Sequence, residues 1–384
     1  MEALEELELG GRARRAVPVI AVALVTILFA AVVYLRPPLT AASLQSQPRG
    51  SASWTLEAAY QVAYDFVSST AGWAALAQGE SESGHGDYWI FVTSDGARHW
   101  RLQATGTTDA LPPLVDLHMF DPRHGYVVVG RELALASQDG GVHWERVLLP
   151  PKIELGLTFS DPRHGWFSGA DGVCRSCLYL GPDNFYATSD GGSRWSMLPA
   201  PPGRSLAFRG PFEGWAGTSP KAGGTVFSTD DGGLTWAPHP LPESGTPNKN
   251  GRVATYVRLL PGHGVMAMTG QLAFTSPDGG ETWRPVVAPP GARFFDMAFQ
   301  DATHWWAMPS GNLFKTSDAG QTWTHVSMQF DDWQYSVQVV DARHAWARLD
   351  AATGIQDPLR GTGLAVTSDG GLHWDYANVP HPTV

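Results

Sequence analysis

An eight-residue figure that occurs seven times is the feature that most limits how this chain can fold. Its clearest copy runs from Thr188 to Trp195: Ser or Thr stands two positions before an Asp, Gly one or two positions after it, and Trp five positions after it. Such an Asp can accept backbone N–H bonds inside a tight turn, and Gly adopts positive φ without a Cβ clash. The figure, called here the Asp-Trp turn, predicts a hairpin turn with an aromatic anchor. Its aspartates are Asp95, Asp139, Asp190, Asp231, Asp278, Asp318 and Asp369.

Successive copies are separated by 40 to 51 residues, and the segments between them carry short strand-like runs. A fixed period of this length is typical of a β-propeller blade. A second figure, an apolar run followed by a turn and then an aromatic residue, alternates with the first. It is clear at residues 120–126, 159–166 and 340–346 and weaker at 66–73, 208–215, 259–265 and 299–305. The two figures predict an all-β, seven-bladed propeller over residues 54–384.

The order of the figures assigns the four strands of each blade. The first strand ends at the second figure, whose turn is called here the inner turn, and the third strand leads into the Asp-Trp turn. Both turns are then expected on one face, the turn face. The long connections, at residues 79–87, 171–183, 241–252 and 350–363, fall on the opposite face. Binding residues concentrate on variable loops held by a rigid scaffold, so we expect that opposite face to bind a partner.

The Asp-Trp turn resembles the Asp-box, or BNR repeat, with the pattern S-x-D-x-G-x-T-W. This repeat occurs in sialidases, sortilin-type receptors, some endoglucanases and the photosystem II assembly factor family. The resemblance covers roughly residues 60–380. It implies the architecture, whereas one fold carries many activities. The photosystem II assembly factor family is similar in having one seven-bladed disc, which implies a role as an assembly scaffold.

The N-terminal region has the pattern of a membrane anchor. Residues 1–15 are polar, residues 16–35 contain no charge, and residues 36–53 resemble a linker. Twenty apolar residues span the hydrocarbon core of a bilayer as a helix. The arginines before the span outnumber those after it, so we expect a cytoplasmic N-terminus and an extracytoplasmic propeller in a single-pass protein of the cell membrane. A cleaved signal peptide is the alternative.

Charge and cysteine content exclude some classes of function. The 26 basic and 37 acidic residues leave a formal charge of -11, which argues against a nucleic-acid-binding surface. The only cysteines, Cys174 and Cys177, are two residues apart. Outside the cytosol this spacing favours a local disulfide over a redox dithiol, and a zinc site would need a second pair of ligands.

Candidate binding residues lie where first strands are expected to begin, near the mouth of the central channel. Acids, arginines and aromatic side chains converging on a cavity are typical of a ligand site, although a solvated rim is the simpler interpretation. The candidates for ligand binding are Arg252, Tyr256, Arg293, Asp296, Asp332 and Trp333.

Recurrence argues that the seven turn aspartates and the repeated histidines are structural, because a reactive site needs one asymmetric group of residues. We therefore expect no metal and no cofactor. The sequence favours a non-enzymatic scaffold that binds a protein, peptide or glycan. The alternative is a sialidase-like or endoglucanase-like glycoside hydrolase using Asp116 and Asp296. Those two residues are expected on opposite sides of the channel, whereas acid–base hydrolysis needs carboxylates about 5 to 10 Å apart.

Overall fold

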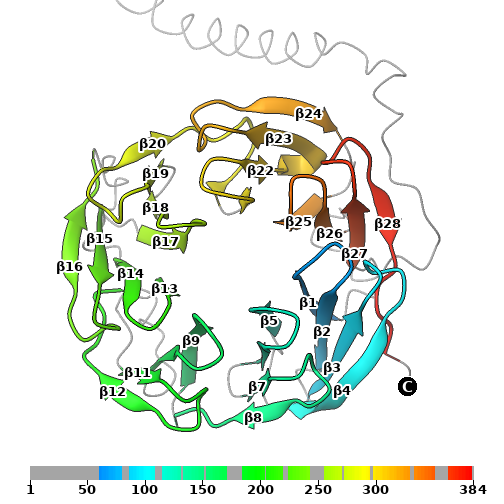
Figure 1. The fold of residues 1–384 in the computed structure, drawn as a ribbon, viewed down its shortest axis with the longest axis horizontal. Helices are drawn as coiled ribbons and strands as arrows, with labels where there is room; N and C mark the ends of the chain where they lie inside the picture. The colour runs from blue at the N-terminus through cyan, green and yellow to red at the C-terminus, as the bar shows by residue number, and fades with distance from the viewer. Residues whose placement is uncertain are drawn as a thin grey trace, which may run out of the picture. The chain divides into compact units, whose positions relative to one another are not determined.

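The computed structural model describes thirteen segments of the chain: residues 60–79, 86–108, 115–130, 133–150, 153–170, 184–203, 205–218, 224–242, 255–269, 272–294, 297–328, 333–350 and 362–382. They form seven four-stranded antiparallel sheets, each built from four consecutive strands and arranged in a ring (Figure 1). The predicted seven-bladed propeller is confirmed. The proposed anchor (residues 16–35), the linker (residues 36–53) and Trp54, the first residue predicted for the propeller, lie outside these segments. Within them, no helix has the length and apolar character needed to cross a membrane.

The first four blades follow one another in chain order. Blade 1 holds β1 (Gln61–Phe66), β2 (Gly72–Gly79), β3 (Gly86–Thr93) and β4 (Arg101–Thr108). Blade 2 holds β5 (Val115–Met119), β6 (Gly125–Val129), β7 (Leu133–Ser137) and β8 (Glu145–Val147). Blade 3 holds β9 (Ile153–Phe159), β10 (Gly165–Ala170), β11 (Asn184–Thr188) and β12 (Ser196–Leu198). Blade 4 holds β13 (Leu206–Arg209), β14 (Glu213–Gly217), β15 (Thr225–Thr229) and β16 (Ala237–Pro240).

Three further blades complete the ring. Blade 5 holds β17 (Thr255–Leu259), β18 (Val265–Thr269), β19 (Leu272–Ser276) and β20 (Arg284–Val286). Blade 6 holds β21 (Met297–Phe299), β22 (Trp305–Ala307), the 3-10 helix η5 (Pro309–Gly311), β23 (Asn312–Thr316) and β24 (Thr324–Met328). Blade 7 holds β25 (Trp333–Val339), β26 (Ala345–Asp350), β27 (Thr362–Thr367) and β28 (Asp375–Ala377).

The first strand of each blade lines the centre of the ring and the fourth lies at its outer edge (Figure 1). The second strands carry much of the core: every residue of β6, β18 and β22 is buried. A strand buried on both faces reads as a continuous apolar run, which explains why alternation is weak in these segments.

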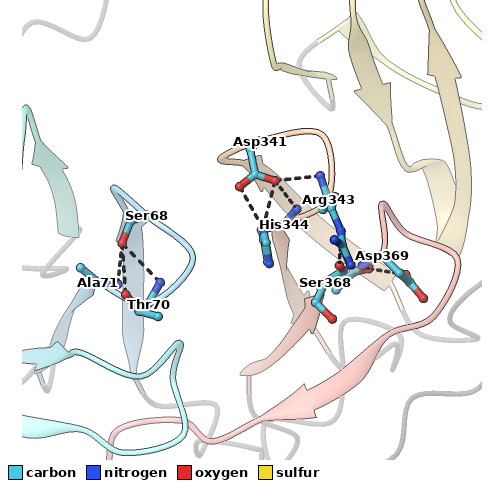
Figure 2. A network of polar contacts seen from close by, with 9 residues as sticks. Ser68, Thr70, Ala71, Asp341, Arg343, His344, Ser368 and Asp369 are labelled. Carbon is cyan, nitrogen blue, oxygen red and sulfur yellow. Dashed lines mark hydrogen bonds and ion pairs between the residues drawn. The ribbon is translucent and has the colours of Figure 1, made fainter.

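The two repeated turns of a blade lie side by side, as the strand order predicts. In six blades the residue after the turn aspartate donates its backbone N–H to a carbonyl of the inner turn, for example Gly140 to Arg123 at 2.8 Å. Figure 2 shows the pair in blade 7, where Arg343 of the inner turn donates from Nε to the Ser368 carbonyl at 3.2 Å. These bonds place both turns on one face of the ring.

Neighbouring blades are joined by a repeated aromatic contact. A large side chain near the start of the second strand packs on a residue at or next to the end of the next blade's first strand. Trp166, for example, stacks on Phe208 of β13 with ring centroids 3.6 Å apart. The strand register places Met266 at this position in blade 5 and Trp306 in blade 6. The aromatic position predicted from the sequence lies one residue too early in these two blades, at Val265 and Trp305. In the structure Val265 and Trp305 occupy the preceding position, which is Gly in blades 1 to 4.

Blade 7 joins blade 1 through the same contacts that join other neighbours. Trp346 stacks on Phe66 with centroids 4.0 Å apart, as Trp166 does on Phe208. Beyond β28, Asn378 donates its backbone N–H to Ala97 and accepts the indole N–H of Trp100 at 2.8 Å. Val287, beyond β20, makes the equivalent pair of bonds with blade 6. The ring is therefore closed by packing and hydrogen bonds between complete sheets.

Candidate functional site

The seven turn aspartates are bonded within their own turns. In each, the carboxylate accepts the hydroxyl of the preceding Ser or Thr and a backbone N–H four residues on. In blade 5 the hydroxyl of Thr282 and its backbone N–H lower the pKa of Asp278 to about 2. The same pair of bonds from Thr322 lowers the pKa of Asp318 to about 2. Carboxylates held in this way stabilise the turn and have no oxygen arranged for catalysis.

The repeated histidines also have local partners. Seven of them bond through Nδ1 to the aspartate of the same turn at 2.6 to 2.9 Å: His99, His124, His143, His164, His304, His344 and His373. In the described segments, no group of three or more His, Cys, Asp or Glu side chains is arranged to hold a metal ion.

Three of the six residues proposed for ligand binding lie outside the described residues: Arg252, Asp296 and Asp332. Cys174 and Cys177 lie outside them as well. The proposed disulfide and the proposed catalytic pair of Asp116 with Asp296 therefore stay predictions.

The other candidates are described in part. Tyr256 in β17 is 46% exposed, and Arg293 between β20 and β21 is exposed. Trp333 is the first residue of β25. Asp116 lies in β5, is exposed, and lines a cavity in the inner wall of the ring.

That cavity, the inner-wall cavity, has a volume of about 200 Å³ and lies where blades 7, 1 and 2 meet. The inner strands β25, β1 and β5 supply most of its lining, with β26 and β27 behind them. Among the residues that line it, five carry polar side chains: Tyr64, Asp116, Ser336, Gln338 and Arg348. A small concave site with a few converging polar groups is the usual form of a ligand pocket.

Hydrogen bonds between the blades fix this wall. Arg348 in β26 donates from Nη1 to the Val62 carbonyl of blade 1 at 2.9 Å. The Gln338 side chain accepts the Phe66 backbone N–H at 2.9 Å and donates to the Asp65 carboxylate. Asp65 in turn accepts the Met119 N–H of blade 2 at 2.6 Å. Three blades are thus held in register around the cavity, so its shape is set before any ligand arrives.

Asp65 sits behind this wall and is 7% exposed. Burial raises the pKa of its carboxyl, whereas the Met119 N–H bond, the nearby His118 and the Gln338 bond oppose that rise. His118 Nδ1 lies 3.5 Å from the Asp65 carboxylate. With its oxygens occupied by these contacts, Asp65 holds the blades together and is poorly placed to act as a base on a ligand.

Tyr64 provides the wall's unsatisfied group. Its hydroxyl is buried, and no residue of the described segments lies within hydrogen-bonding reach of it. Burial raises the pKa of this hydroxyl, and the charge of Arg348 opposes the rise in part. A buried hydroxyl without a partner costs about 1 to 3 kcal/mol, which a ligand with a hydrogen-bonding group can recover.

Sequence reasoning missed Tyr64 and Arg348, although the repeat contained a signal for the arginine. Arg348 stands two residues after the aromatic position of the second strand. In the other blades this position holds Ala75, Val128, Ser168, Gly217, Met268 and Met308. Arg348 is the one charged residue among these seven equivalent positions. A charge found in a single blade of a repeat is a signal that this position has a role of its own.

No family model matches the sequence. The photosystem II assembly lipoprotein Ycf48 of Synechococcus sp. (strain CC9902) is 28% identical over 129 residues, which are 32% of this chain and 35% of that relative's length. The match therefore spans about a third of the curated relative.

Among solved structures, the chain covers 99% of a structure described as YCF48 bound to D1 peptide, with 16% identity, a TM-score of 0.55 and 85% of this chain covered. It also covers 99% of YCF48 from Cyanidioschyzon merolae, with 18% identity, a TM-score of 0.53 and 83% of this chain covered. At such identities the likeness to these structures shows the fold alone. In fold and in the matched third of the relative, the chain resembles propellers of the photosystem II assembly factor kind.

Proposed function

We propose that this protein is a non-enzymatic scaffold whose propeller binds a peptide segment of a partner protein at the inner-wall cavity. The observation that carries the proposal is the preformed inner-wall cavity, which gathers Arg348, Asp116 and Tyr64, a tyrosine whose buried hydroxyl has no hydrogen-bond partner in the described segments. A peptide supplies backbone donors and acceptors as well as charged side chains, which matches this mixture of groups.

The comparisons support a peptide as the ligand. The propeller described as bound to D1 peptide has the same fold and is covered almost completely by this chain. Residues 16–35, as an uncleaved anchor, would hold the propeller at the membrane surface, where segments of membrane proteins emerge during assembly.

The chemistry of the cavity favours binding over turnover. Asp116 is the one carboxylate among the described residues that line it. Its Oδ1 accepts the N–H of Leu117 at 2.9 Å. Hydrolysis by acid–base catalysis requires a second carboxyl group within about 5 to 10 Å with a free oxygen, and Asp65 has its oxygens engaged.

The proposal is tested with the full chain in detergent micelles and two probes, the D1 peptide and peptides selected from a phage-displayed random library. Fluorescence anisotropy gives the dissociation constant of each labelled peptide. Replacing Tyr64→Phe removes one hydrogen bond and should weaken binding about fivefold to tenfold. Asp116→Asn should weaken peptides that carry a cationic residue and spare the others.

Tyr186→Phe is the matched control, because Tyr186 lies in β11, away from the cavity, and loses the same atom. Its affinities should equal those of the wild type. The proposal is wrong if neither probe yields a binding peptide, or if the binding peptides have equal affinity for the wild type, Tyr64→Phe and Asp116→Asn.

A further inference from the structure

The outer edge of blade 1 differs from the outer edges of the other blades. The fourth strand of every blade ends its sheet, so one side of it pairs with no strand of the described segments. β4 has eight residues, whereas the fourth strands of the other six blades have three to five (Figure 1). None of the residues from Arg101 to Thr107 is buried. An edge of this length presents a row of backbone N–H and C=O groups with which another strand can pair.

The other six edges are short or carry proline. β8, β12 and β28 have three residues each, and β24 has five. β16 contains Pro238 and Pro240, and β20 contains Pro285. Proline has no N–H, so a sheet tolerates it where the nitrogen faces away from the neighbouring strand. Short strands and prolines protect an edge from pairing with other chains, and β4 has neither form of protection.

Blade 1 also extends further from the turn face than blade 2. Its second strand has eight residues, whereas β6, which begins at the equivalent glycine, has five. Three more residues at about 3.3 Å each add roughly 10 Å. The pairing of β3 with β4 is interrupted by a bulge between Ile90 and Phe91, and beyond it Ala104–Thr107 pairs without a break. This stretch of β4, called here the open edge, leads toward the face on which the sequence predicts partner binding.

The side chains beside the open edge favour an acidic partner. Gly106 has no side chain, and the Tyr88 ring lies across it: a Cβ on Gly106 would be 2.6 Å from the Tyr88 hydroxyl oxygen. Burial raises the pKa of that hydroxyl, and the charge of Arg146, an exposed residue of β8 in blade 2, opposes the rise. Tyr88 packs on a cluster that includes core residues of blade 2. A hydroxyl and a guanidinium therefore lie on the blade 2 side of the open edge, and a carboxylate suits both as an acceptor.

We propose that the open edge binds an extended segment of a partner protein, which adds a fifth strand to blade 1 and places an acidic side chain beside Gly106, toward Arg146. The backbone of the added strand supplies the hydrogen bonds, and its alternate side chains supply the selectivity. Thr105 and Thr107 are exposed and offer a small, uncharged surface on the other side of the strand. No residue of β4 lines the inner-wall cavity, so this inference stands or falls independently of peptide binding there.

The test uses the full chain in detergent micelles and a fluorescein-labelled heptapeptide of sequence TVTETVT, with the dissociation constant measured by fluorescence anisotropy. Thr105 pairs with Trp89 at the register where Pro240 pairs with Thr225 in blade 4. Thr105→Pro therefore removes an N–H that faces away from β3 and should weaken the peptide at least about fivefold. Thr105→Val loses the same hydroxyl, which donates to the Tyr88 carbonyl at 2.9 Å, but keeps the N–H and should bind as the wild type does.

A second control concerns another edge. Met197 pairs with Tyr186 in blade 3 at the register where Pro238 pairs with Phe227 in blade 4. Met197→Pro should therefore leave the affinity for the peptide unchanged. Hydrogen exchange followed by mass spectrometry locates the site, because the bound peptide should slow exchange in residues 101–108.

Changes in the peptide complete the test and decide it if Thr105→Pro does not fold. N-methylation of alternate residues blocks one edge of the peptide and should weaken it at least about tenfold for one of the two alternations. Replacing its glutamate with glutamine should weaken binding to the wild type about twofold to fivefold and leave binding to Arg146→Gln unchanged.

Several results would overturn the inference. They are a wild type that does not bind the heptapeptide, a folded Thr105→Pro that binds it as tightly as Thr105→Val does, and equal binding of the peptide and both of its N-methylated forms. An Arg146→Gln variant that still prefers glutamate over glutamine would overturn the acidic contact. A wild type that sediments as a dimer, with Thr105→Pro as a monomer, would show that a second copy of this chain takes the edge in place of a partner protein.

Discussion

Gly280, in the Asp-Trp turn of blade 5, offers a sharp test of how the turns hold neighbouring blades together. Its φ is +88°, a conformation that side chains with a Cβ adopt at a cost. A Cβ at this position would lie 2.4 Å from Cη2 of Trp215, which belongs to blade 4. Trp215 is 2% exposed and packs among other large side chains, so its ring has little room to move away.

The expected effect of Gly280→Ala follows from two costs and one gain. The left-handed backbone costs about 1 to 2 kcal/mol for a residue with a Cβ. Overpacking against a rigid ring costs about 1 to 3 kcal/mol more. Alanine lowers the entropy of the unfolded chain and returns about 0.4 to 1 kcal/mol. We therefore expect the free energy of unfolding to fall by about 2 to 4 kcal/mol.

Gly279 is the matched control because it precedes Gly280 in the same turn, has a φ of +66°, and would place a Cβ in open space. Gly279→Ala should carry the backbone cost alone, about 1 kcal/mol after the entropy term. Urea denaturation of the full chain, followed by circular dichroism, measures both variants. Equal losses of stability would refute the steric argument and show that the turn does not press on blade 4.

Three further predictions use the same denaturation assay. Thr229→Val removes a hydroxyl that accepts the Gly233 N–H at 2.9 Å and donates to the Asp231 carboxylate at 2.8 Å, so the free energy of unfolding should fall by about 1 to 3 kcal/mol. Thr229→Ser keeps the hydroxyl and should cost less, because Ser137 and Ser276 hold the equivalent position in two other blades. Phe66→Leu loses the stack with Trp346 and should cost about 1 to 2 kcal/mol, while Phe212→Leu, 64% exposed, should change stability by less than about 0.5 kcal/mol. Asp278 and Asp318 have pKa values of about 2 in the folded protein, below the value near 3.9 of an unfolded chain. Their contribution to the free energy of unfolding is therefore complete above about pH 4 and is lost as the pH falls toward 2. Asp318→Asn should flatten this dependence of stability on pH, and an unchanged slope would contradict the role of that carboxylate.

The sequence predicted the architecture because the architecture repeats. Each Asp-Trp turn needs the same hydrogen bonds, so the same residue types recur in every copy and can be recognised in the sequence. Because each blade has one such turn, counting the turns gives the number of blades. The register error in blade 6 has a physical reason: Trp305 directly follows His304, where Gly125 and Gly165 follow histidines in other blades. Either of the adjacent tryptophans, Trp305 or Trp306, could be the aromatic residue of the second figure. The strand pairing of Trp305 with Thr316 shows that Trp306 holds the aromatic position.

The candidate site was harder to predict because its residues lie within strands. Asp116 was found at the start of a first strand, but Tyr64 and Arg348 stand in alternating apolar surroundings where a polar residue resembles an outward-facing position. Only the contact across blades, from Arg348 to the Val62 carbonyl, shows that both face one cavity. Side chains from strands far apart in the sequence meet here, and no local pattern encodes that meeting.

Positions where a blade departs from the repeat are where we expect binding, because a departure gives up stability that the repeat would supply. Arg348 stands where Met268 and Met308 stand in two other blades, and holding a guanidinium in a cavity wall carries a desolvation cost. Arg348→Met relieves that cost but also removes the Arg348 bond to the Val62 carbonyl, so we expect little net change in the free energy of unfolding together with a lower peptide affinity at the inner-wall cavity. Measuring stability and affinity on the same preparations decides the matter: if Arg348→Met unfolds more easily and still binds the peptide with the affinity of the wild type, Arg348 serves the structure of the ring and the reasoning that links this departure to binding is wrong.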